Sequence, residues 1–357
     1  MSLGGVMSDT PLNFAKTVYY FNRVSHQSYL KIISEQADIN LYKLTNDSPQ
    51  DEVESVMMKA HAYQIDSTRS AIPQKYWATE ELLLRNPNLL VVSTSGAGFD
   101  TVDVDACSRA GVLVVNQTGA NREAVAEHAL GLILALSKRI NETDRIIRKE
   151  KNIDREKFIG DEVAEKILGI VGIGNTGSTL ARMCSLALRM RIIAFDPYVD
   201  SDTMKTSGAQ KVNFEELLTL ADYISVNCPL NKETRNLFNA EAFKKMKSDA
   251  YFVSTARGGI HDEEALFNAL VEGSIKAAGL DVWVEEPPEI DHKLLSLDNV
   301  IATPHTAGLT HSARERLGSW AAEQVIDVLN GGKPARLINP DAWQLFEKRY
   351  HCLFDNP

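Results

Sequence analysis

The sequence has 357 residues, of which 44% are hydrophobic and 24% are charged, and its formal net charge is −10. This length exceeds what one ordinary hydrophobic core accommodates, so it predicts two domains. The negative charge argues against nucleic acid or an anionic membrane as a partner, no stretch reaches the roughly 18 apolar residues of a membrane span, and a small molecule is the expected partner.

Residues 1–10 lack the charged start and apolar middle of a secretory signal. The four cysteines, Cys107, Cys184, Cys228 and Cys352, lie far apart without paired spacing, which argues against a disulfide framework or a thiolate metal site. We therefore expect a cytoplasmic protein without a bound metal.

Short apolar runs alternate with amphipathic stretches in the first third of the chain. Runs of β-branched and aromatic residues predict strands, and apolar residues at helical spacing predict helices. Strands are expected at residues 18–21, 38–44, 63–66, 89–94 and 112–115, and helices at residues 29–36, 53–61, 79–85 and 104–110. This order predicts a small parallel α/β unit.

Residues 121–149 carry apolar side chains at helical spacing, including Ala124, Leu132 and Leu136. The spacing predicts one long helix that connects the two domains. We interpret His128, which lies on this helix, as a packing residue.

The alternation of strands and helices restarts after this segment. Strands are expected at residues 167–171, 191–195, 223–227, 251–255, 277–282 and 299–302. Six strands with intervening helices predict a doubly wound sheet. A further helix at residues 312–329 ends at Gly331 and Gly332, and residues 341–357 form an aromatic-rich tail to which no structure is assigned.

A glycine fingerprint follows the first strand of this second half. Gly172 permits a tight turn, Gly174 lets a backbone approach a pyrophosphate, and Gly177 lets the following helix pack closely. Asp196 ends the next strand, where its carboxylate can bind a ribose diol and repel a 2′-phosphate. The pattern predicts a dinucleotide site that prefers NAD to NADP.

Three polar side chains stand at or just beyond the ends of later strands: Arg257, Glu286 and His305. These ends form the ligand-facing edge of a doubly wound sheet. Hydride transfer to a carbonyl leaves charge on its oxygen, so the reaction needs a proton donor such as His305. Glu286 is expected to orient that imidazole, and Arg257 to hold a substrate carboxylate and polarise the carbonyl.

These motifs together resemble the D-isomer-specific 2-hydroxyacid dehydrogenase family. The matching segments are residues 95–100, 116–128, 172–177, 229–234, 254–259, 279–282 and 303–305. The resemblance covers nearly everything from residue 18 to residue 340. It implies an NAD-dependent oxidoreductase that interconverts a small D-2-hydroxy acid and its 2-oxo acid.

The resemblance also implies roles for single residues. Arg257, Glu286 and His305 would be catalytic, with Glu286 rather than Glu285 in register because it precedes Pro287. The backbone amides of Ala97 and Gly98, together with Arg257, would bind the substrate. The implied cofactor-binding set is Gly172, Gly174, Asn175, Thr176, Gly177, Asp196, Thr234, Thr255, Ala256, Asp281 and Gly308.

The implied fold is α/β with two Rossmann-like domains, each a doubly wound parallel sheet. A flavodoxin-like, discontinuous substrate domain would comprise residues 1–120 and 307–340, and the NAD-binding domain residues 121–306, followed by the tail at residues 341–357. The resemblance further implies a homodimer formed through the helix at residues 121–149.

Several alternatives stay open. Arg69 stands two places later than the arginine of phosphoglycerate-specific relatives, and few residues follow the last matching segment, so a short-form reductase without a regulatory domain is expected. A formate dehydrogenase would carry Gln where Glu286 stands. An NADH-sensing corepressor-like protein would bind the cofactor without turnover. Glyoxylate, hydroxypyruvate and bulkier 2-oxo acids all remain candidate substrates.

Overall fold

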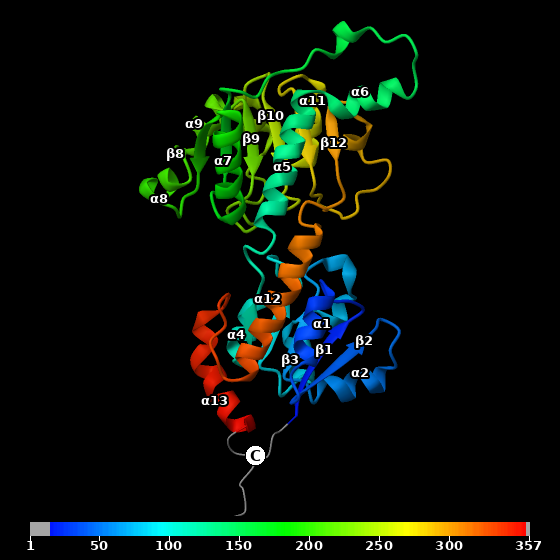
Figure 1. Ribbon diagram of the computed structural model, residues 1–357, viewed down its shortest axis with the longest axis vertical. Helices are drawn as coiled ribbons and strands as arrows, with labels where there is room; N and C mark the ends of the chain where they lie inside the picture. Colours follow the sequence, from blue (N-terminus) through cyan, green and yellow to red (C-terminus); the bar gives the residue numbers. More distant parts are fainter. Residues whose placement is uncertain (1–14, 355–357) are drawn as a thin grey trace, which may run out of the picture. The chain divides into compact units, whose positions relative to one another are not determined.

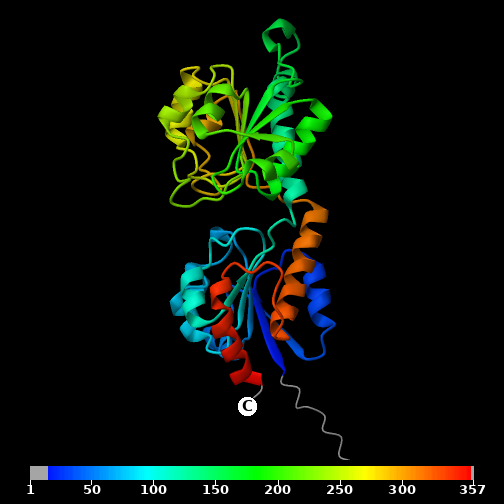
Figure 2. The ribbon, with the colours of Figure 1, turned by 90° about the vertical axis from the view of Figure 1, so that its left-hand side faces the viewer.

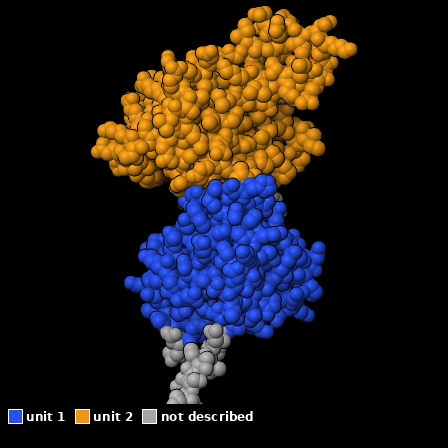
Figure 3. Space-filling view, in the orientation of Figure 1, with its two compact units in different colours: residues 1–120, 311–357 blue, residues 121–310 orange. Residues whose placement is uncertain are grey.

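The computed structural model describes residues 15–354, which fall into two compact units (Figure 3). Unit 1 runs to Ala120 and resumes at His311, and unit 2 comprises Asn121–Thr310. Residues 1–10, on which we based the absence of a secretory signal, lie outside the described residues. Within residues 15–354, no helix is long and apolar enough to cross a membrane.

Unit 1 contains a five-stranded parallel sheet in the order β2-β1-β3-β4-β5 (Figure 1). Its strands are β1 (Lys16–Phe21), β2 (Ile39–Leu44), β3 (Ala62–Ile65), β4 (Val91–Thr94) and β5 (Leu113–Val115). Its helices are α1 (Gln27–Ser34), α2 (Gln50–Met57), α3 (Glu80–Arg85), α4 (Val104–Ala110), α12 (His311–Leu329) and α13 (Trp343–Phe354).

Successive strand residues of unit 1 enter two separate cores because side chains alternate between the faces of a sheet. Val18 packs with residues of α1 and α12, such as Ile33 and Val325. Tyr19 packs on the opposite face with residues of α2, such as Met57. Helices therefore cover both faces of the sheet.

Unit 2 contains a seven-stranded parallel sheet in the order β12-β11-β10-β9-β6-β7-β8, and Figure 2 shows helices on both sides of this sheet. Its strands are β6 (Ile167–Val171), β7 (Arg191–Phe195), β8 (Ala209–Lys211), β9 (Tyr223–Val226), β10 (Tyr251–Ser254), β11 (Ala277–Leu280) and β12 (Val300–Ala302). Its helices are α5 (Arg122–Ser137), α6 (Ile140–Ile147), α7 (Asn175–Leu188), α8 (Ser201–Thr206), α9 (Phe214–Leu220), α10 (Ala240–Lys245) and α11 (Glu263–Val271).

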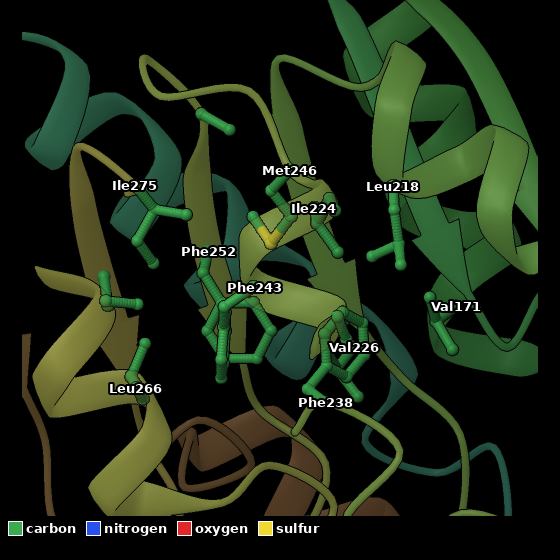
Figure 4. Packing of buried hydrophobic residues seen from close by; sticks show 14 of the residues in the cluster. Val171, Leu218, Ile224, Val226, Phe238, Phe243, Met246, Phe252, Leu266 and Ile275 are labelled. Carbon is green, nitrogen blue, oxygen red and sulfur yellow. The ribbon is translucent and has the colours of Figure 1, made fainter. Parts of the chain in front are cut away.

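Aliphatic and aromatic side chains pack against one face of the unit 2 sheet (Figure 4). Phe238 and Phe243 each meet Phe252 edge to face, with ring centroids 5.0 and 5.4 Å apart. Such edge-to-face pairs add to the stabilisation that burial provides. This core packs against the sheet whose strand ends carry the predicted site.

The structure corrects the sequence-based elements in three places. The long helix expected at residues 121–149 is two helices, because Arg139 adopts a left-handed φ of 54° and the carbonyl of Ser137 accepts a bond from the amide of Asp161 instead. The sheet of unit 2 has a seventh strand, β8, at its edge. The tail at residues 341–357 contains helix α13, which packs in unit 1 through Phe346.

Candidate active site

The segment from the end of β6 through the first turn of α7 needs glycine at two of its three fingerprint positions. Gly172 has a φ of 89°, and a Cβ there would lie 2.7 Å from the amide nitrogen of Cys228. A Cβ on Gly177 would lie 2.2 Å from the carbonyl oxygen of Gly172. Gly174 is different, because a Cβ there would meet nothing within 4 Å. It is the N-cap of α7 and supplies no side chain to the helix N-terminus, whose amides are therefore available to an anion.

Asp196 stands directly after β7 and is tied to this loop. Its Oδ2 accepts a hydrogen bond from the amide of Ile173 at 3.1 Å, and its Oδ1 accepts one from the amide of Tyr198 at 3.0 Å. The hydroxyl of Tyr198 in turn donates to Glu233 at 2.5 Å. The carboxylate is thus fixed beside the glycine loop, where a ribose diol can donate to it.

Polar atoms without partners occur along the same sheet edge. Thr255 Oγ1 and Asn227 Oδ1 are buried and have no hydrogen-bond partner among the described residues. Buried polar atoms rarely stay unpaired in a native protein, so these two have hydrogen-bonding capacity left for an ordered water or a bound ligand. Thr234 differs, since its hydroxyl donates to the carbonyl of Pro229 at 2.6 Å within a turn. Uncapped amides, a fixed carboxylate and orphaned polar atoms together fit a dinucleotide.

The structure brings Arg257, Glu286 and His305 to one edge of the unit 2 sheet. They follow β10, β11 and β12, which are neighbouring parallel strands. His305 Nδ1 lies 2.7 Å from Glu286 Oε2, and the amide of Trp283 donates to Glu286 Oε1 at 3.1 Å. Because an ionised carboxylate only accepts, His305 Nδ1 is the donor, and its Nε2 is left for a reacting group. The imidazole is 37% exposed, so that nitrogen can be reached.

The surroundings of Glu286 favour its ionised form. Burial raises the pKa of this carboxyl, but the hydrogen bond and charge of His305, the amide of Trp283 and the charge of Arg257 outweigh burial. The pKa of Glu286 is therefore lowered from its ordinary value. A carboxylate at this position orients the imidazole and stabilises its protonated form.

Sequence reasoning missed a close contact between the loops that carry Arg257 and Glu286. A Cβ on Gly258 would lie 1.9 Å from the carbonyl oxygen of Trp283, so only glycine fits there. Arg257 Nη1 donates to the carbonyl of Ala256 at 2.7 Å. The double glycine directly after Arg257 was the signal that two backbones approach closely at this point.

Asp281 anchors the loop that carries His305. Its fully buried carboxylate accepts hydrogen bonds from Thr303 Oγ1 at 2.6 Å and from the amides of Thr306 and Ala307 at 2.8 and 2.9 Å. Its carbonyl accepts a bond from the amide of His305, whose φ is 55°. Gly308 lies beyond this loop, where a Cβ would meet the side chain of Asn121 at 2.8 Å. Asp281 thus holds this loop in addition to any contact with a cofactor.

Ala97 and Gly98 lie in unit 1, in the loop after β4. Asn116 Nδ2 donates to the carbonyl of Ala97 at 2.7 Å, and the amide of Gln117 donates to the carbonyl of Gly96 at 2.9 Å. Within residues 15–354, the amides of Ala97 and Gly98 donate to no protein acceptor. The carbonyls of this loop are therefore bound by the protein, while two adjacent donors remain for an anion.

Comparison with known proteins identifies the family. Residues 130–307 match the NAD-binding domain of the D-isomer-specific 2-hydroxyacid dehydrogenases. A glyoxylate reductase from Thermofilum pendens is 34% identical over 331 residues, which are 92% of this chain and 96% of that protein. The chain belongs to the D-isomer-specific 2-hydroxyacid dehydrogenase family.

Other members of this family match in different ways. A D-3-phosphoglycerate dehydrogenase from Archaeoglobus fulgidus is 39% identical over 259 residues, and the chain spans only 49% of its length. A solved D-lactate dehydrogenase from Aquifex aeolicus, complexed with NAD and lactic acid, matches with a TM-score of 0.74 and 28% identity. The match covers 90% of this chain and 99% of that protein's chain. The family, the paired parallel α/β sheets and the NAD-binding domain predicted from the sequence are confirmed.

Proposed function

We propose that the protein is an NAD-dependent oxidoreductase that interconverts a small D-2-hydroxy acid and its 2-oxo acid. The observation that carries this proposal is the His305–Glu286 pair, which stands with Arg257 at the same sheet edge as the glycine loop. An imidazole held by a carboxylate can give up a proton and take it back at its other ring nitrogen, which is what the reaction needs. The proposed reaction is also the one that the name of the chain's family describes.

Each residue of the trio has a separate task. His305 Nε2 gives a proton to the C2 oxygen during reduction and takes it back during oxidation. Glu286 holds Nδ1 and stabilises the imidazolium. Arg257 binds the substrate carboxylate and polarises the C2 carbonyl. In unit 1, the amides of Ala97 and Gly98 are two adjacent donors of the kind that binds a carboxylate, as the family resemblance implies.

Bound NAD would supply the hydride chemistry. The amides at the N-terminus of α7, beginning at Gly174, would hold its pyrophosphate, and Asp196 would accept bonds from the adenosine ribose. The family resemblance assigns Thr255 to the nicotinamide side, and its Oγ1 has no hydrogen-bond partner among the described residues. The negative charge of Asp196 disfavours a 2′-phosphate, which supports NAD over NADP.

The deciding experiment is oxidation of NADH against a panel of 2-oxo acids, with NADPH in parallel. The panel contains glyoxylate, hydroxypyruvate, pyruvate, phenylpyruvate and 3-phosphohydroxypyruvate. Turnover with one class establishes the activity and names the substrate. NADH binding without turnover across the panel would instead favour a cofactor-sensing protein.

We predict that His305→Gln lowers kcat by roughly 1,000-fold while NADH still binds, because the proton donor is lost and the cofactor contacts remain. Glu286→Gln should also lose activity, since an amide cannot stabilise the imidazolium. Glu285→Gln is the matched control and should keep the activity of the unchanged protein. Steady-state kinetics and NADH fluorescence titration measure these effects. Unchanged turnover in His305→Gln would exclude the proposed mechanism.

We further propose a cytoplasmic homodimer. Helix α6 buries none of its residues and stands away from the sheet of unit 2 (Figure 1). Ile140, Ile147 and Ile159 on or near it are 52 to 69% exposed, and such apolar surface is typical of an interface. All four cysteines are unpaired, which suits a reducing compartment. Sedimentation analysis should give twice the chain mass of 39.5 kDa, and a monomer at all concentrations would contradict the proposal.

A further inference from the structure

A line of side chains runs from helix α5 to the loop that carries His305. His128 Nε2 lies 3.1 Å from Thr303 Oγ1, and Thr303 Oγ1 lies 2.6 Å from Asp281 Oδ1. His128 Nε2 also lies 3.7 Å from that same carboxylate oxygen. Asp281 is fully buried, and the side chain of His128 is 24% exposed. The sequence-based interpretation of His128 as a packing residue did not include these contacts.

The short distance between Thr303 and Asp281 fixes the direction of these hydrogen bonds. A carboxylate can only accept, so the single hydroxyl proton of Thr303 goes to Asp281. The carbonyl of Leu280 is a poorer acceptor for that proton because it lies 3.4 Å away. The hydroxyl oxygen of Thr303 must then accept from His128, which requires a proton on His128 Nε2. If Nε2 carried no proton, His128 and Asp281 would compete for the single hydroxyl proton of Thr303, and one of the two short contacts would have no proton in it.

This line of hydrogen bonds ends on the groups that hold the catalytic pair. Asp281 binds the amides of Thr306 and Ala307 and, through its carbonyl, the amide of His305. The carbonyl of Thr303 accepts a bond from Trp283 Nε1 at 3.0 Å. The backbone amide of Trp283 holds Glu286. Thr303 is therefore linked to the supports of both His305 and Glu286.

We propose that His128 is a positioning residue. It donates a hydrogen bond from Nε2 to Thr303 Oγ1 and thereby keeps the Asp281-anchored loop in the geometry that His305 needs. This inference rests on the proposed oxidoreductase function. His128 touches neither substrate nor cofactor in this proposal. Its effect reaches the reaction only through Thr303, Asp281 and the loop at residues 303–307.

Two substitutions separate donation from packing. His128→Leu fills similar space without a donor, and we expect a fall in kcat of about tenfold, which equals about 1.4 kcal/mol, the size of one lost hydrogen bond. His128→Gln places an amide donor at a similar reach and should recover most of that loss. The KM for NADH should change little in both variants. A packing role predicts the opposite order, with leucine at least as active as glutamine.

Thr303→Val tests the next link. It removes the hydroxyl that joins His128 to Asp281, so it should lower kcat about as much as His128→Leu does. The double variant should be no slower than the slower single variant, because both changes break the same line. Losses that multiply in the double variant would overturn the proposal. Thermal unfolding of each variant identifies any that fails to fold.

A measurement without turnover keeps the inference separate from the proposed function. In the unchanged protein labelled with ¹⁵N-histidine, the His128 signal, assigned by its absence in His128→Gln, should show a proton on Nε2. A signal with the proton on Nδ1 alone would overturn the inference even if the enzyme is active. Protonated Nε2 in a protein that turns over no 2-oxo acid would leave the hydrogen-bond line in place and reject the proposed activity.

Discussion

The two units share the same order of paired parallel strands but differ at the strand ends where a ligand would bind. In unit 1, β1 pairs with β2 and β3, and in unit 2, β6 pairs with β7 and β9. The first residue after each of these central strands has a positive φ, 57° at Asn22 and 89° at Gly172. The amide of Asn22 donates to the carbonyl of Leu44 at 2.7 Å, and that of Gly172 donates to the carbonyl of Phe195 at 2.9 Å. The chain therefore leaves both strands in the same way.

The following residues separate the two units. In unit 1, His26 caps α1 by accepting a bond from the amide of Ser28 at 3.1 Å, so a side chain occupies the helix N-terminus. In unit 2, the N-cap of α7 is Gly174, which has no side chain to cap the helix. The second strand is followed by Asp196 in unit 2 and by Thr45 in unit 1. The two units thus share a topology, but only unit 2 combines an uncapped helix N-terminus with a carboxylate after the neighbouring strand, which are the features that the proposed NAD site requires.

The largest expected effect comes from closing the glycine loop. Gly177→Ala should destabilise unit 2 by on the order of 3 kcal/mol and abolish NADH binding, because its Cβ would press on the Gly172 carbonyl. Gly174→Ala is the matched control, since its Cβ meets no protein atom. It should weaken NADH binding while leaving the melting temperature nearly unchanged. Calorimetry and NADH titration measure the two effects, and equal stability losses would contradict this division of roles.

The same comparison explains how much the sequence could reveal. Gly172, Gly174 and Asp196 were predictable because a strand, a glycine spacing and a carboxylate follow one another locally. Arg257, Glu286 and His305 were predictable because parallel strands bring their ends to one edge. Each of these predictions depends on chain order and strand direction alone.

Features that depend on packing between distant segments were not predictable. Arg139 breaks the helix at residues 121–149 although its sequence keeps helical spacing, since Asp161, much later in the chain, takes the carbonyl of Ser137. Strand β8 has only three residues, two of them polar, and gave no apolar signal. The contact of His128 with Thr303 joins segments 175 residues apart, and no periodicity indicates it.

Each unit contains a histidine with a lowered pKa, fully buried in the case of His261 and partly buried in the case of His61. Burial lowers the pKa of His261 in unit 2 to about 4, and burial together with the charge of Lys16 lowers that of His61 in unit 1 to about 4. The folded-state pKa of His261 is below the ordinary value of 6.5, so the unfolded chain binds more protons between these values. The free energy of unfolding is therefore undiminished by His261 above pH 6.5, and it falls as the pH decreases from 6.5 towards 4. The loss should be roughly 3 kcal/mol from His261.

Replacing each histidine by leucine sharpens this difference. Neither ring nitrogen of His261 has a hydrogen-bond partner among the described residues, whereas His61 Nδ1 accepts a bond from the amide of Thr17 at 3.0 Å. At pH 7, His261→Leu should therefore be neutral or stabilising, and His61→Leu should cost about 1 kcal/mol. Urea unfolding at a series of pH values tests both. A His261→Leu variant that keeps the full acid sensitivity would show that other groups cause it.

The smallest expected effect is that of replacing Asp196, the carboxylate that follows β7 in unit 2 and has Thr45 in its place in unit 1. Asp196→Ala should weaken NADH binding about tenfold, since it removes both the ribose acceptor and the acceptor for the Ile173 amide. Asp196→Asn keeps an oxygen for that amide and removes the charge, so it should weaken NADH binding less while relaxing the preference over NADPH. Fluorescence titration with both cofactors separates these contributions. If Asp196→Asn leaves the preference unchanged, the neighbouring Glu233 becomes the group that excludes the 2′-phosphate, because Tyr198 holds its carboxylate near the same loop.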